Sequence, residues 1–489
     1  MKSYIIKPKS VRKSEILEKQ YAFASSKYHH IFIKNKNGKT IEDLREESFL
    51  GKNPVQVTVK SDFKMLKISS SEEQFFKTNL SEVASTKPFS YKLENGNWIF
   101  FATRGSVQKI SFLNIKNNEN IIHSNNMYAV KINNTLLFYC LAFLKSKLLV
   151  DYAKTVSHGG TISEFLPHQI LNFKIPFPTI ANNKNPEKVE EFASLVVQNI
   201  IDKEEQIKLK NNQIDELIEK ELKENQKAES FSYGYPRISE IKEETRLDTG
   251  IYEREFKEID FLIRNYKDGY FQIPLDKFKS GSTPKIRIFD PQNKKYKWVT
   301  PTLITDEGNY QPSTTINMDT KNNLSKDCIL IINRTSKGKK GEYVGITCFY
   351  EVETLGLGQH NQGLYQIKDY SKTEKLFITC LLNSKTYRKL CGCVAIGSKM
   401  KEMKSYDFAF LKFPSFSEKK QQEVSNLYYS PIEKNINLTL ENYLEKEKTR
   451  NAEAGIFQLN MEIFSLREQL EDLVHKIVME EPIEIRLEY

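Results

Sequence analysis

The chain repeats itself, and this repetition constrains the possible fold more than any single motif does. Residues 139–177 align without a gap to residues 377–415, at a separation of 238 positions. Upstream, IFFATRG aligns with ILIINRT at a separation of 230, and HSNNMYAV aligns with HNQGLYQI at 237. The separations rise in chain order, as expected when two homologous units differ by small insertions. We therefore predict a duplicated architecture.

The repeated segments indicate what each unit contains. The runs NWIFFAT and DCILIIN are rich in β-forming apolar residues and lead into polar loops, so each predicts a buried strand. LLFYCLAFLKSKLLVDYA and LFITCLLNSKTYRKL carry apolar residues at helical spacing and indicate amphipathic helices packed on the sheet. A glycine turn and a short proline-ended strand, FKIPFP or LKFPSF, close each unit. Each unit is therefore predicted to be a mixed α/β globule.

A long charged helix is predicted after each unit. Between Asn185 and Lys227 the chain has almost no glycine, and Ala193, Ile200, Ile207 and Ile214 recur at steps of seven with Leu217 on the adjoining position. After the second unit, apolar residues alternate in steps of three and four, which is the pattern of a coiled-coil seam: Ile456, Leu459, Ile463, Leu466, Leu470, Leu473 and Ile477. Since a narrow seam suits another helix better than a sheet, we expect the helices of the two halves to pack on each other.

Charge, cysteine content and hydropathy indicate which partners, metal sites and cell compartment to expect. Lys and Arg total 73 against 63 Asp and Glu, a formal net charge of +10, which favours a polyanion and first of all nucleic acid. The six cysteines form no CxxC pair, so buried, reduced thiols are expected and a zinc ribbon is not. The start lacks an apolar signal region, and the apolar run at 136–144 is too short to cross a bilayer. We expect a cytoplasmic protein without membrane association.

The order of these motifs resembles a known family over nearly the whole chain. Two tandem α/β units each show a G-x-x-P entry, a strand followed by an Arg-containing loop, a HSNN or HNQG block and a FLKSK or LLNSK helix. Each then has a glycine turn before IPFP or KFPSF, and a long helix. This arrangement is similar to the specificity (S) subunit of type I restriction-modification systems. The resemblance implies two target recognition domains that each read half of a bipartite, asymmetric DNA sequence. It also implies paired helices that set the gap between the halves and dock two methyltransferase (M) subunits.

The expected fold class is α+β, with two homologous mixed α/β target recognition domains separated by long helices that form an antiparallel coiled-coil spacer. The expected boundaries are residues 1–183 for the first recognition domain and 184–230 for the first spacer helix. Residues 231–417 are expected to form the second recognition domain, and residues 418–489 the second spacer helix region.

Candidate DNA-binding residues lie in the loops that follow the predicted strands. Reading DNA requires cations for phosphates and hydrogen-bonding side chains for base edges, interleaved on loops projecting from a rigid sheet. In the first unit the candidates are Arg104, Ser106, Gln108, Lys109, His123, Asn125, Asn126, Lys154 and His158. In the second unit they are Arg334, Ser336, Lys337, Lys339, Lys340, His360, Asn361, Gln362, Lys399 and Lys401. The alternative is structural, because an Asn or His beside a strand often caps a turn and a lysine-rich hairpin is often only solvated.

Gly159 and Gly397 also have two interpretations. A backbone loop lying against the duplex would need glycine, and so would a helix C-cap in the left-handed conformation. We expect the cap to be the reason for glycine at both positions.

Motifs for catalysis are missing from the sequence. It contains no GxxxxGK[ST] loop for ATP and no [DNS]PP[YF] motif of an amino-methyltransferase. The acidic clusters TDEGN and EVE lack a lysine partner at nuclease-like spacing, so no catalytic residue, metal ligand or cofactor is assigned to this chain. The resemblance assigns the chemistry to partners, which are an adenine-N6 methyltransferase using S-adenosylmethionine and motor-nuclease (R) subunits using ATP and Mg.

Two other functions remain open at this point. One is the specificity subunit of a type IIB or type IIG restriction system, which has a similar polypeptide in another enzyme context. The other is a coiled-coil scaffold that does not bind DNA, in which the basic loops are incidental.

Overall fold

The computed structural model contains two compact units that interleave along the chain. The first comprises residues 1–205, 433–452 and 462–489, and the second comprises residues 206–432 and 453–461. The residues described below are 3–18, 28–52, 60–68, 81–84, 92–106, 109–117, 119–157, 162–244, 247–283, 296–312, 315–316, 323–336, 343–433 and 437–487.

The first unit is built around a four-stranded antiparallel sheet in the order β4-β10-β7-β8. These strands are β4 (Arg45–Leu50), β10 (Met127–Ile132), β7 (Gly96–Ala102) and β8 (Ile110–Ile115). A three-stranded sheet, β6-β5-β9, adjoins it, and β5 runs parallel to β9. Its strands are β5 (Lys60–Leu66), β6 (Ser81–Ala84) and β9 (Ile121–His123).

The second unit repeats this topology. Its central sheet has the antiparallel order β13-β21-β17-β19, formed by β13 (Lys279–Ser280), β21 (Leu364–Ile367), β17 (Cys328–Ile332) and β19 (Thr347–Tyr350). The second sheet, β15-β14-β20-β16, again contains one parallel pair, β14 with β20. It is formed by β14 (Tyr296–Val299), β15 (Thr315–Ile316), β16 (Asn323–Leu324) and β20 (Gly358–His360). The predicted duplication is confirmed in strand order and strand direction.

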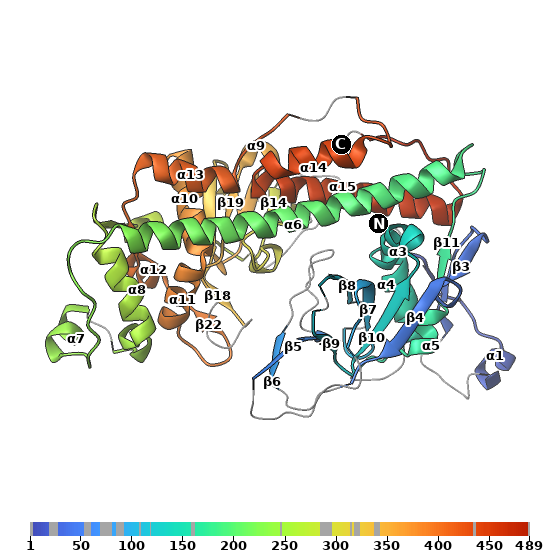
Figure 1. Ribbon diagram of the computed structural model, residues 1–489, viewed down its shortest axis with the longest axis horizontal. Helices are drawn as coiled ribbons and strands as arrows, with labels where there is room; N and C mark the ends of the chain where they lie inside the picture. The colour runs from blue at the N-terminus through green and yellow to red at the C-terminus, as the bar shows by residue number, and fades with distance from the viewer. Residues whose placement is uncertain are drawn as a thin grey trace. The chain divides into compact units, whose positions relative to one another are not determined.

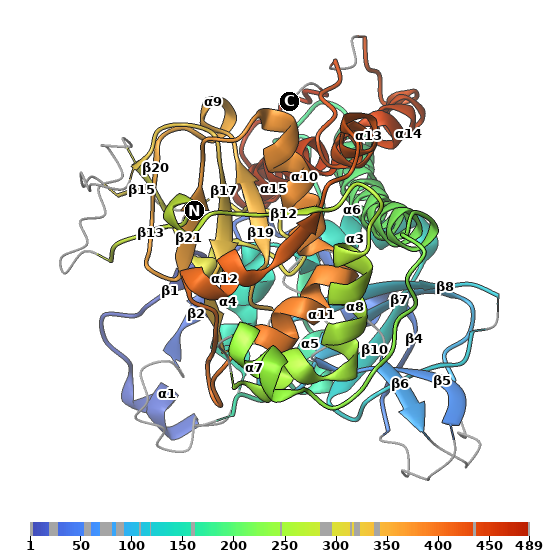
Figure 2. The same ribbon diagram turned by 90° about the vertical axis from the view of Figure 1, so that its left-hand side faces the viewer.

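The central strands form the cores because they are apolar on both faces. In β7, Trp98, Ile99, Phe100 and Phe101 have no exposed surface, and in β17 the whole of Cys328–Ile332 is buried. A strand covered on both sides shows such a continuous apolar run rather than alternation. Figure 2 shows β17 and β19 side by side with α10 (Lys372–Asn383) beside them.

Each predicted helical run forms two helices rather than one, because a serine interrupts it. In the first unit α3 (Asn134–Leu144) is followed by α4 (Lys147–Val156), and in the second α10 is followed by α11 (Lys385–Val394). The hydroxyl of Ser146 donates to the carbonyl of Phe143 at 2.7 Å and caps the amide of Leu148 at 3.2 Å. Ser384 does the same with Leu381 and Tyr387, at 2.6 and 3.4 Å. Serine competes with the helix for its own backbone groups and so starts a new helix.

The closing strands also correspond. In the first unit β11 (Lys174–Pro176) pairs with β3 (Gly38–Thr40), and in the second β23 (Lys412–Pro414) pairs with β12 (Tyr270–Gln272). Beyond each pair one further backbone hydrogen bond recurs, from Phe177 to Asn37 at 2.9 Å and from Ser415 to Gly269 at 3.0 Å. The remaining elements of the first unit are β1 (Ile5–Ile6), α1 (Lys13–Glu18), β2 (His30–Ile31), α2 (Ile41–Leu44) and α5 (Pro167–Leu171).

The second unit has further short elements of its own. They are α7 (Ile238–Glu244), η3 (Thr249–Tyr252), α8 (Arg254–Arg264), η4 (Leu275–Lys277), η5 (Pro301–Leu303), β18 (Arg334–Thr335), α9 (Val352–Leu355), β22 (Lys401–Glu402), α12 (Ser405–Phe410) and α13 (Glu418–Tyr428).

Long helices are shared by the two units. Helix α6 (Pro186–Glu224) is one unbroken helix in Figure 1, and it contributes its first 20 residues, 186–205, to the first unit and the rest to the second. Helix α15 (Ile456–Met479) begins in the second unit and continues into the first. All seven seam residues predicted in α15 are buried, as are Ala193, Ile200, Ile207 and Ile214 of α6. Leu217 is only half-buried and Ile218 takes the fully buried position instead.

Within the first unit, α6 and α15 run antiparallel. Near the start of α6, Asn182 donates to the carbonyl of Lys476 at 3.0 Å, while Lys203 lies 2.6 Å from Glu462 further along. The start of α6 therefore lies beside the end of α15, and residues further along α6 lie beside the earlier part of α15. The fold class, α+β with two related units and antiparallel long helices, is confirmed. The domain boundaries drawn from the sequence remain a prediction, since the units share these helices.

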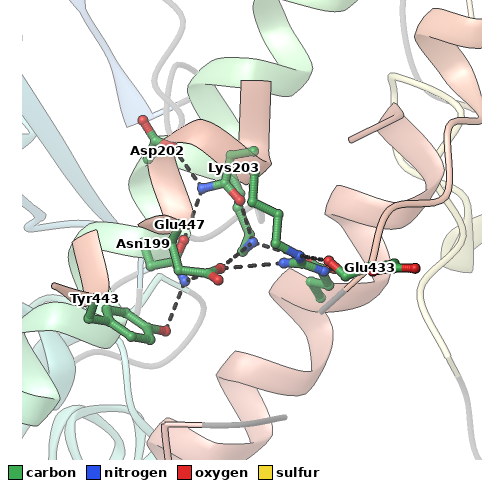
Figure 3. Close-up of polar contacts among 9 residues, drawn as sticks. Asn199, Asp202, Lys203, Glu433, Tyr443 and Glu447 are labelled. Atoms are coloured by element: carbon green, nitrogen blue, oxygen red, sulfur yellow. Dashed lines mark hydrogen bonds and ion pairs between the residues drawn. The ribbon is translucent and has the colours of Figure 1, made fainter. Parts of the chain in front are cut away.

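A buried polar cluster fixes the helix α14 (Tyr443–Glu453) against α6 and α15 (Figure 3). The ammonium of Lys203 has no exposed surface and lies 3.3 Å from Glu447, 2.6 Å from Asn451 and 2.6 Å from Glu462. Arg450 pairs with Glu447 and Glu462, and its Nε donates to the carbonyl of Glu433 at 3.0 Å. Two cations and two carboxylates therefore balance one another in the interior, which buried charges require.

A carboxylate attaches each α/β core to one of these long helices. In the first unit the backbone amide of Lys147, at the start of α4, donates to Glu471 of α15 at 2.9 Å. In the second the amide of Lys385, at the start of α11, donates to Asp215 of α6 at 2.8 Å. Lys147 and Lys385 are related by the repeat separation of 238. Negative charge at a helix N-terminus is favourable because amide groups there lack helical acceptors. The same attachment is thus made twice, by different helices.

Candidate nucleic-acid interface

Three loop segments meet at one end of the central sheet of the first unit. The backbone amide of Thr103, just after β7, donates to the carbonyl of Asn126 in the β9–β10 turn at 2.9 Å. The amide of Phe165 donates back to Thr103 at 2.9 Å, and the amide of Gly105 donates to Ser163 at 2.8 Å. We call residues 103–106, 124–126 and 162–165 the first loop edge. Sequence reasoning had singled out the first two segments, and the structure brings them together.

The second unit has a loop edge made of the corresponding residues. The amide of Asn333 donates to the carbonyl of Gly363 at 3.0 Å, and the amide of Met403 donates to Asn333 at 2.8 Å. Strand pairing joins Arg334 to Glu402 and Thr335 to Lys401, as Arg104 is bridged to Glu164 in the first unit. Residues 333–336, 361–363 and 396–403 form the second loop edge. The hydrogen bonds and bridges of the two edges join equivalent residues, whose numbers differ by the repeat separations of 230, 237 and 238.

Most described candidates at these edges reach the surface. Exposed side chains are Arg104, Asn125, Ser336, Gln362 and Lys399, and half-buried ones are Ser106, Lys109, Asn126, Arg334, Asn361 and Lys401. Lys154 is exposed on the last turn of α4. Gln108, His158, Lys337, Lys339 and Lys340 lie outside the described residues. Cations and hydrogen-bonding groups therefore occur together at or near both edges.

His123 and His360 are not part of this surface, which corrects the sequence-based assignment. His123 has no exposed surface, its Nε2 lies 3.4 Å from the carbonyl oxygen of Phe49, and the rings of Phe49 and Phe100 pack around it. His360 is 1% exposed, and its Nε2 lies 3.4 Å from the carbonyl oxygen of Lys279. Burial lowers the pKa of each imidazole from 6.5 to about 4. Both rings are neutral core residues, and they connect β9 to β4 in the first unit and β20 to β13 in the second.

The glycine of each G-x-x-P entry is explained by the same junction. A Cβ at Gly51 would collide with the carbonyl oxygens of His123 and Ser124, and one at Gly281 with those of His360 and Asn361. Only glycine permits this close approach of two backbones. Pro54 and Pro284 lie outside the described residues.

Some candidate polar groups have local roles. The side-chain oxygen of Asn361 accepts the amide of Gly363 at 2.8 Å, so it caps the β20–β21 turn as the structural alternative predicted. The guanidinium of Arg104 lies 3.2 Å from the carboxylate of Glu164, and both groups are well exposed. Because such a pair contributes only about 0.2–1 kcal/mol, Arg104 remains available to a stronger partner.

Gly397 has a different role from the predicted helix cap. Helix α11 ends at Val394, two residues before the strand bridge between Ile396 and Glu402. Gly397 has φ +111°, and a Cβ there would collide with the carbonyl oxygen of Met400. The glycine therefore closes a tight hairpin, 396–402, at the second loop edge. Its counterpart Gly159 lies outside the described residues.

Sequence reasoning missed two features of these edges. Glu164 and Glu402 are the strand partners of the two arginines, and the ungapped alignment of the repeats, which places Glu164 over Glu402, already contained that signal. Ile162 and Met400, two residues before them, are 61% and 52% exposed. They also occupy equivalent positions of the repeat.

Other kinds of site receive little support from the described residues. All six cysteines are free thiols, and five of them are buried, as expected. Within the described ranges, His, Cys, Asp and Glu side chains nowhere gather in threes in a way that would hold a metal ion. No helix among the described residues combines the length and the apolar character needed to cross a membrane.

Comparison with known proteins gives structural likeness only. No family model and no curated protein matches the chain. Among solved structures, the type I restriction-modification S subunit from M. genitalium is 12% identical, with 92% of this chain and 96% of that chain covered, at a TM-score of 0.37. The HsdS subunit from Thermoanaerobacter tengcongensis is also 12% identical, with 92% and 98% covered, at a TM-score of 0.29. Sequence identities of 12% and TM-scores of 0.37 and 0.29 assign neither a family nor a function to the chain.

Proposed function

We propose that this chain is a non-catalytic DNA sequence-specificity subunit of a type I restriction-modification complex. The observation that carries the proposal is the occurrence of the same loop edge twice, on the same sheet topology and from repeat-related residues. Two equivalent reading surfaces on one polypeptide suit a bipartite target. Because the two edges differ in their side chains, the two half-sites differ in sequence.

Charge supports DNA as the ligand. The chain carries a net charge of +10, and Arg104, Arg334, Lys399 and Lys401 lie exposed or half-buried at the two edges beside serine and amide groups. Lys109 is next to the first edge, where its amide donates to the carbonyl of Ser106. Cations hold phosphates without regard to sequence, while serine, amide and guanidinium groups distinguish base edges.

The proposed chemistry belongs to partner proteins. As the resemblance of the sequence to type I S subunits implies, two methyltransferase subunits would supply adenine-N6 methylation with S-adenosylmethionine, and motor-nuclease subunits would use ATP and Mg. The described helices α6, α14 and α15 offer long surfaces for docking such partners. In this proposal α6 and α15 also set the distance between the two half-sites.

The test begins by mapping methylated adenines in the host genome, which identifies the target. The complex assembled with the methyltransferase encoded beside this gene is then titrated with a duplex carrying that target at several salt concentrations. We expect log K to fall steeply with log salt, because several phosphates are contacted. Flat salt dependence, or binding to no duplex, would support the scaffold function instead. A neighbouring gene for a fused methyltransferase-endonuclease would indicate the type IIB or IIG context.

A further inference from the structure

Each loop edge is built around a strand bridge between an arginine and a glutamate, which in the second unit extends to a two-residue β-ribbon. In the second unit the ribbon joins Arg334–Thr335 of β18 to Lys401–Glu402 of β22. In the first unit the bridge from Arg104 to Glu164, together with the Gly105-to-Ser163 hydrogen bond, makes the same pairing. Successive residues of a strand point to opposite faces, so the register decides which side chains share a face.

An arginine, a serine and an apolar residue lie within two residues of each bridge. Arg334 is opposite Glu402, and Ser336 and Met400 are each two residues along their strands from that pair. In the first unit Ser106 and Ile162 have the same relation to the Arg104–Glu164 pair. Thr335 and Lys401 form the adjacent pair and so belong to the other face, with Lys399 two residues from Lys401. In the second unit the bridge is therefore flanked by lysines, whereas the adjacent pair in the first unit is Gly105 and Ser163.

The apolar member of this set is the unusual one. Met400 is 52% exposed and Ile162 is 61% exposed, although Met400 lies between two lysines and Ile162 lies between a threonine and a serine. A single exposed apolar side chain needs no explanation, but the same placement in both repeats does. The tight hairpin closed by Gly397 projects Met400 at the tip of the second ribbon.

We infer that each loop edge enters the major groove of its half-site, with Met400 and Ile162 packed against the 5-methyl group of a thymine. The inference rests on the proposed function and names the contact that the function requires. A two-stranded ribbon fits the major groove, and the thymine methyl is the apolar feature displayed there. Arg334 or Arg104 at the bridge is placed for guanine, and Lys399 and Lys401 of the second unit are placed for flanking phosphates.

Deoxyuridine tests this contact, because it differs from thymidine only by that methyl group. Each half-site contains at least one A·T pair, since the proposed methylation is of adenine. In the assembled complex, every thymine of the mapped target is replaced one at a time by deoxyuridine and binding is measured by fluorescence anisotropy. Burying one methyl group gives a factor of about four in affinity, so we expect a fourfold loss at one thymine of each half-site.

Variants connect each penalty to its residue. Met400→Ala should abolish the deoxyuridine penalty in one half-site and leave the other half-site unchanged, while Ile162→Ala should do the reverse. Met400→Leu keeps an apolar side chain and should keep the penalty. Leu275→Ala is the matched control, because Leu275 is 53% exposed in η4, outside the loop edges and the long helices, and the change should leave both penalties in place.

The outcomes separate this inference from the proposed function. A complex that binds no duplex contradicts the proposed function itself. A complex that binds its target but shows no deoxyuridine penalty, or that keeps the penalty in Met400→Ala, overturns the ribbon inference and leaves the specificity function standing.

Discussion

At the scale of single residues, His123 and His360 give the protein a defined response to acid. Each imidazole is buried, and burial lowers its pKa to about 4, while an unfolded histidine titrates near 6.5. Between these pH values the unfolded state binds more protons than the folded state. The contribution of each histidine to stability is therefore complete above pH 6.5 and is lost as the pH falls toward 4.

Replacing His123 should reduce this acid sensitivity in the first unit. At pH 5 the neutral, buried histidine costs about 2 kcal/mol of the free energy of unfolding relative to pH 7. We expect His123→Gln to have a correspondingly smaller difference in stability between pH 7 and pH 5. Urea unfolding followed by Trp98 in a Trp298→Phe background reports on this unit, since these are the two tryptophans of the chain. An unchanged difference would show that His123 titrates normally in the fold.

At the scale of elements, the two carboxylates that bind helix N-termini should stabilise different units. Glu471→Gln removes the charge that α15 places at the start of α4, and Asp215→Asn does the same for α6 and α11. Loss of such a charge costs about 1 kcal/mol. We expect Glu471→Gln to lower the urea midpoint reported by Trp98 and Asp215→Asn the midpoint reported by Trp298. Equal effects of either change on both tryptophans would contradict two separate attachments.

The buried cluster of Figure 3 makes a stronger prediction. Lys203→Met leaves the carboxylates of Glu447 and Glu462 with one cation, Arg450, where two were present. Removing one partner of a buried ion pair costs about 3–5 kcal/mol. The double variant Lys203→Met with Glu447→Met should recover most of that loss, because one cation then faces one carboxylate. The free energies of unfolding of the unmodified protein, Lys203→Met and the double variant, measured by urea denaturation, test this prediction. A double variant less stable than Lys203→Met would show that the charges do not compensate one another.

Much of the element list could be predicted, because it depends on local patterns. The apolar runs around Trp98 and Leu330 predicted the central strands, and the spacing of Ile456 to Ile477 predicted α15. The site was predicted less well. His123 and His360 looked like surface polar groups because a sequence does not show that Phe49 or Lys279 lies beside them. Gly397 was assigned to a helix end, because its hairpin contact with Met400 depends on where α11 stops.

At the scale of the whole molecule, the length of the shared helices should determine the spacing of the DNA target. The division between the units falls after Glu205 in α6 and after Met461 in α15. Inserting one heptad at both points lengthens each helix by about 10 Å and keeps its buried seam in register. We expect the tolerated gap between half-sites to grow by about three base pairs, at 3.4 Å each.

The assay for this prediction is binding by the assembled complex to duplexes whose central gap varies. Inserting seven residues in the surface loop near Asn437, outside both helices, is the control and should leave the preferred gap unchanged. A preferred gap that stays the same after lengthening both helices would count against the spacer role.

The interleaving of the units also affects how the protein is made. The second unit is nearly continuous in the chain, at residues 206–432, whereas the first unit needs residues 462–489 to complete it. During translation, the first unit therefore cannot finish folding until the last helix has left the ribosome. The second unit can finish folding before that. The order of synthesis and the order of completion are therefore opposite. A transcript cut short just after the codon for Met461 yields a chain with a complete second unit and an unfinished first unit.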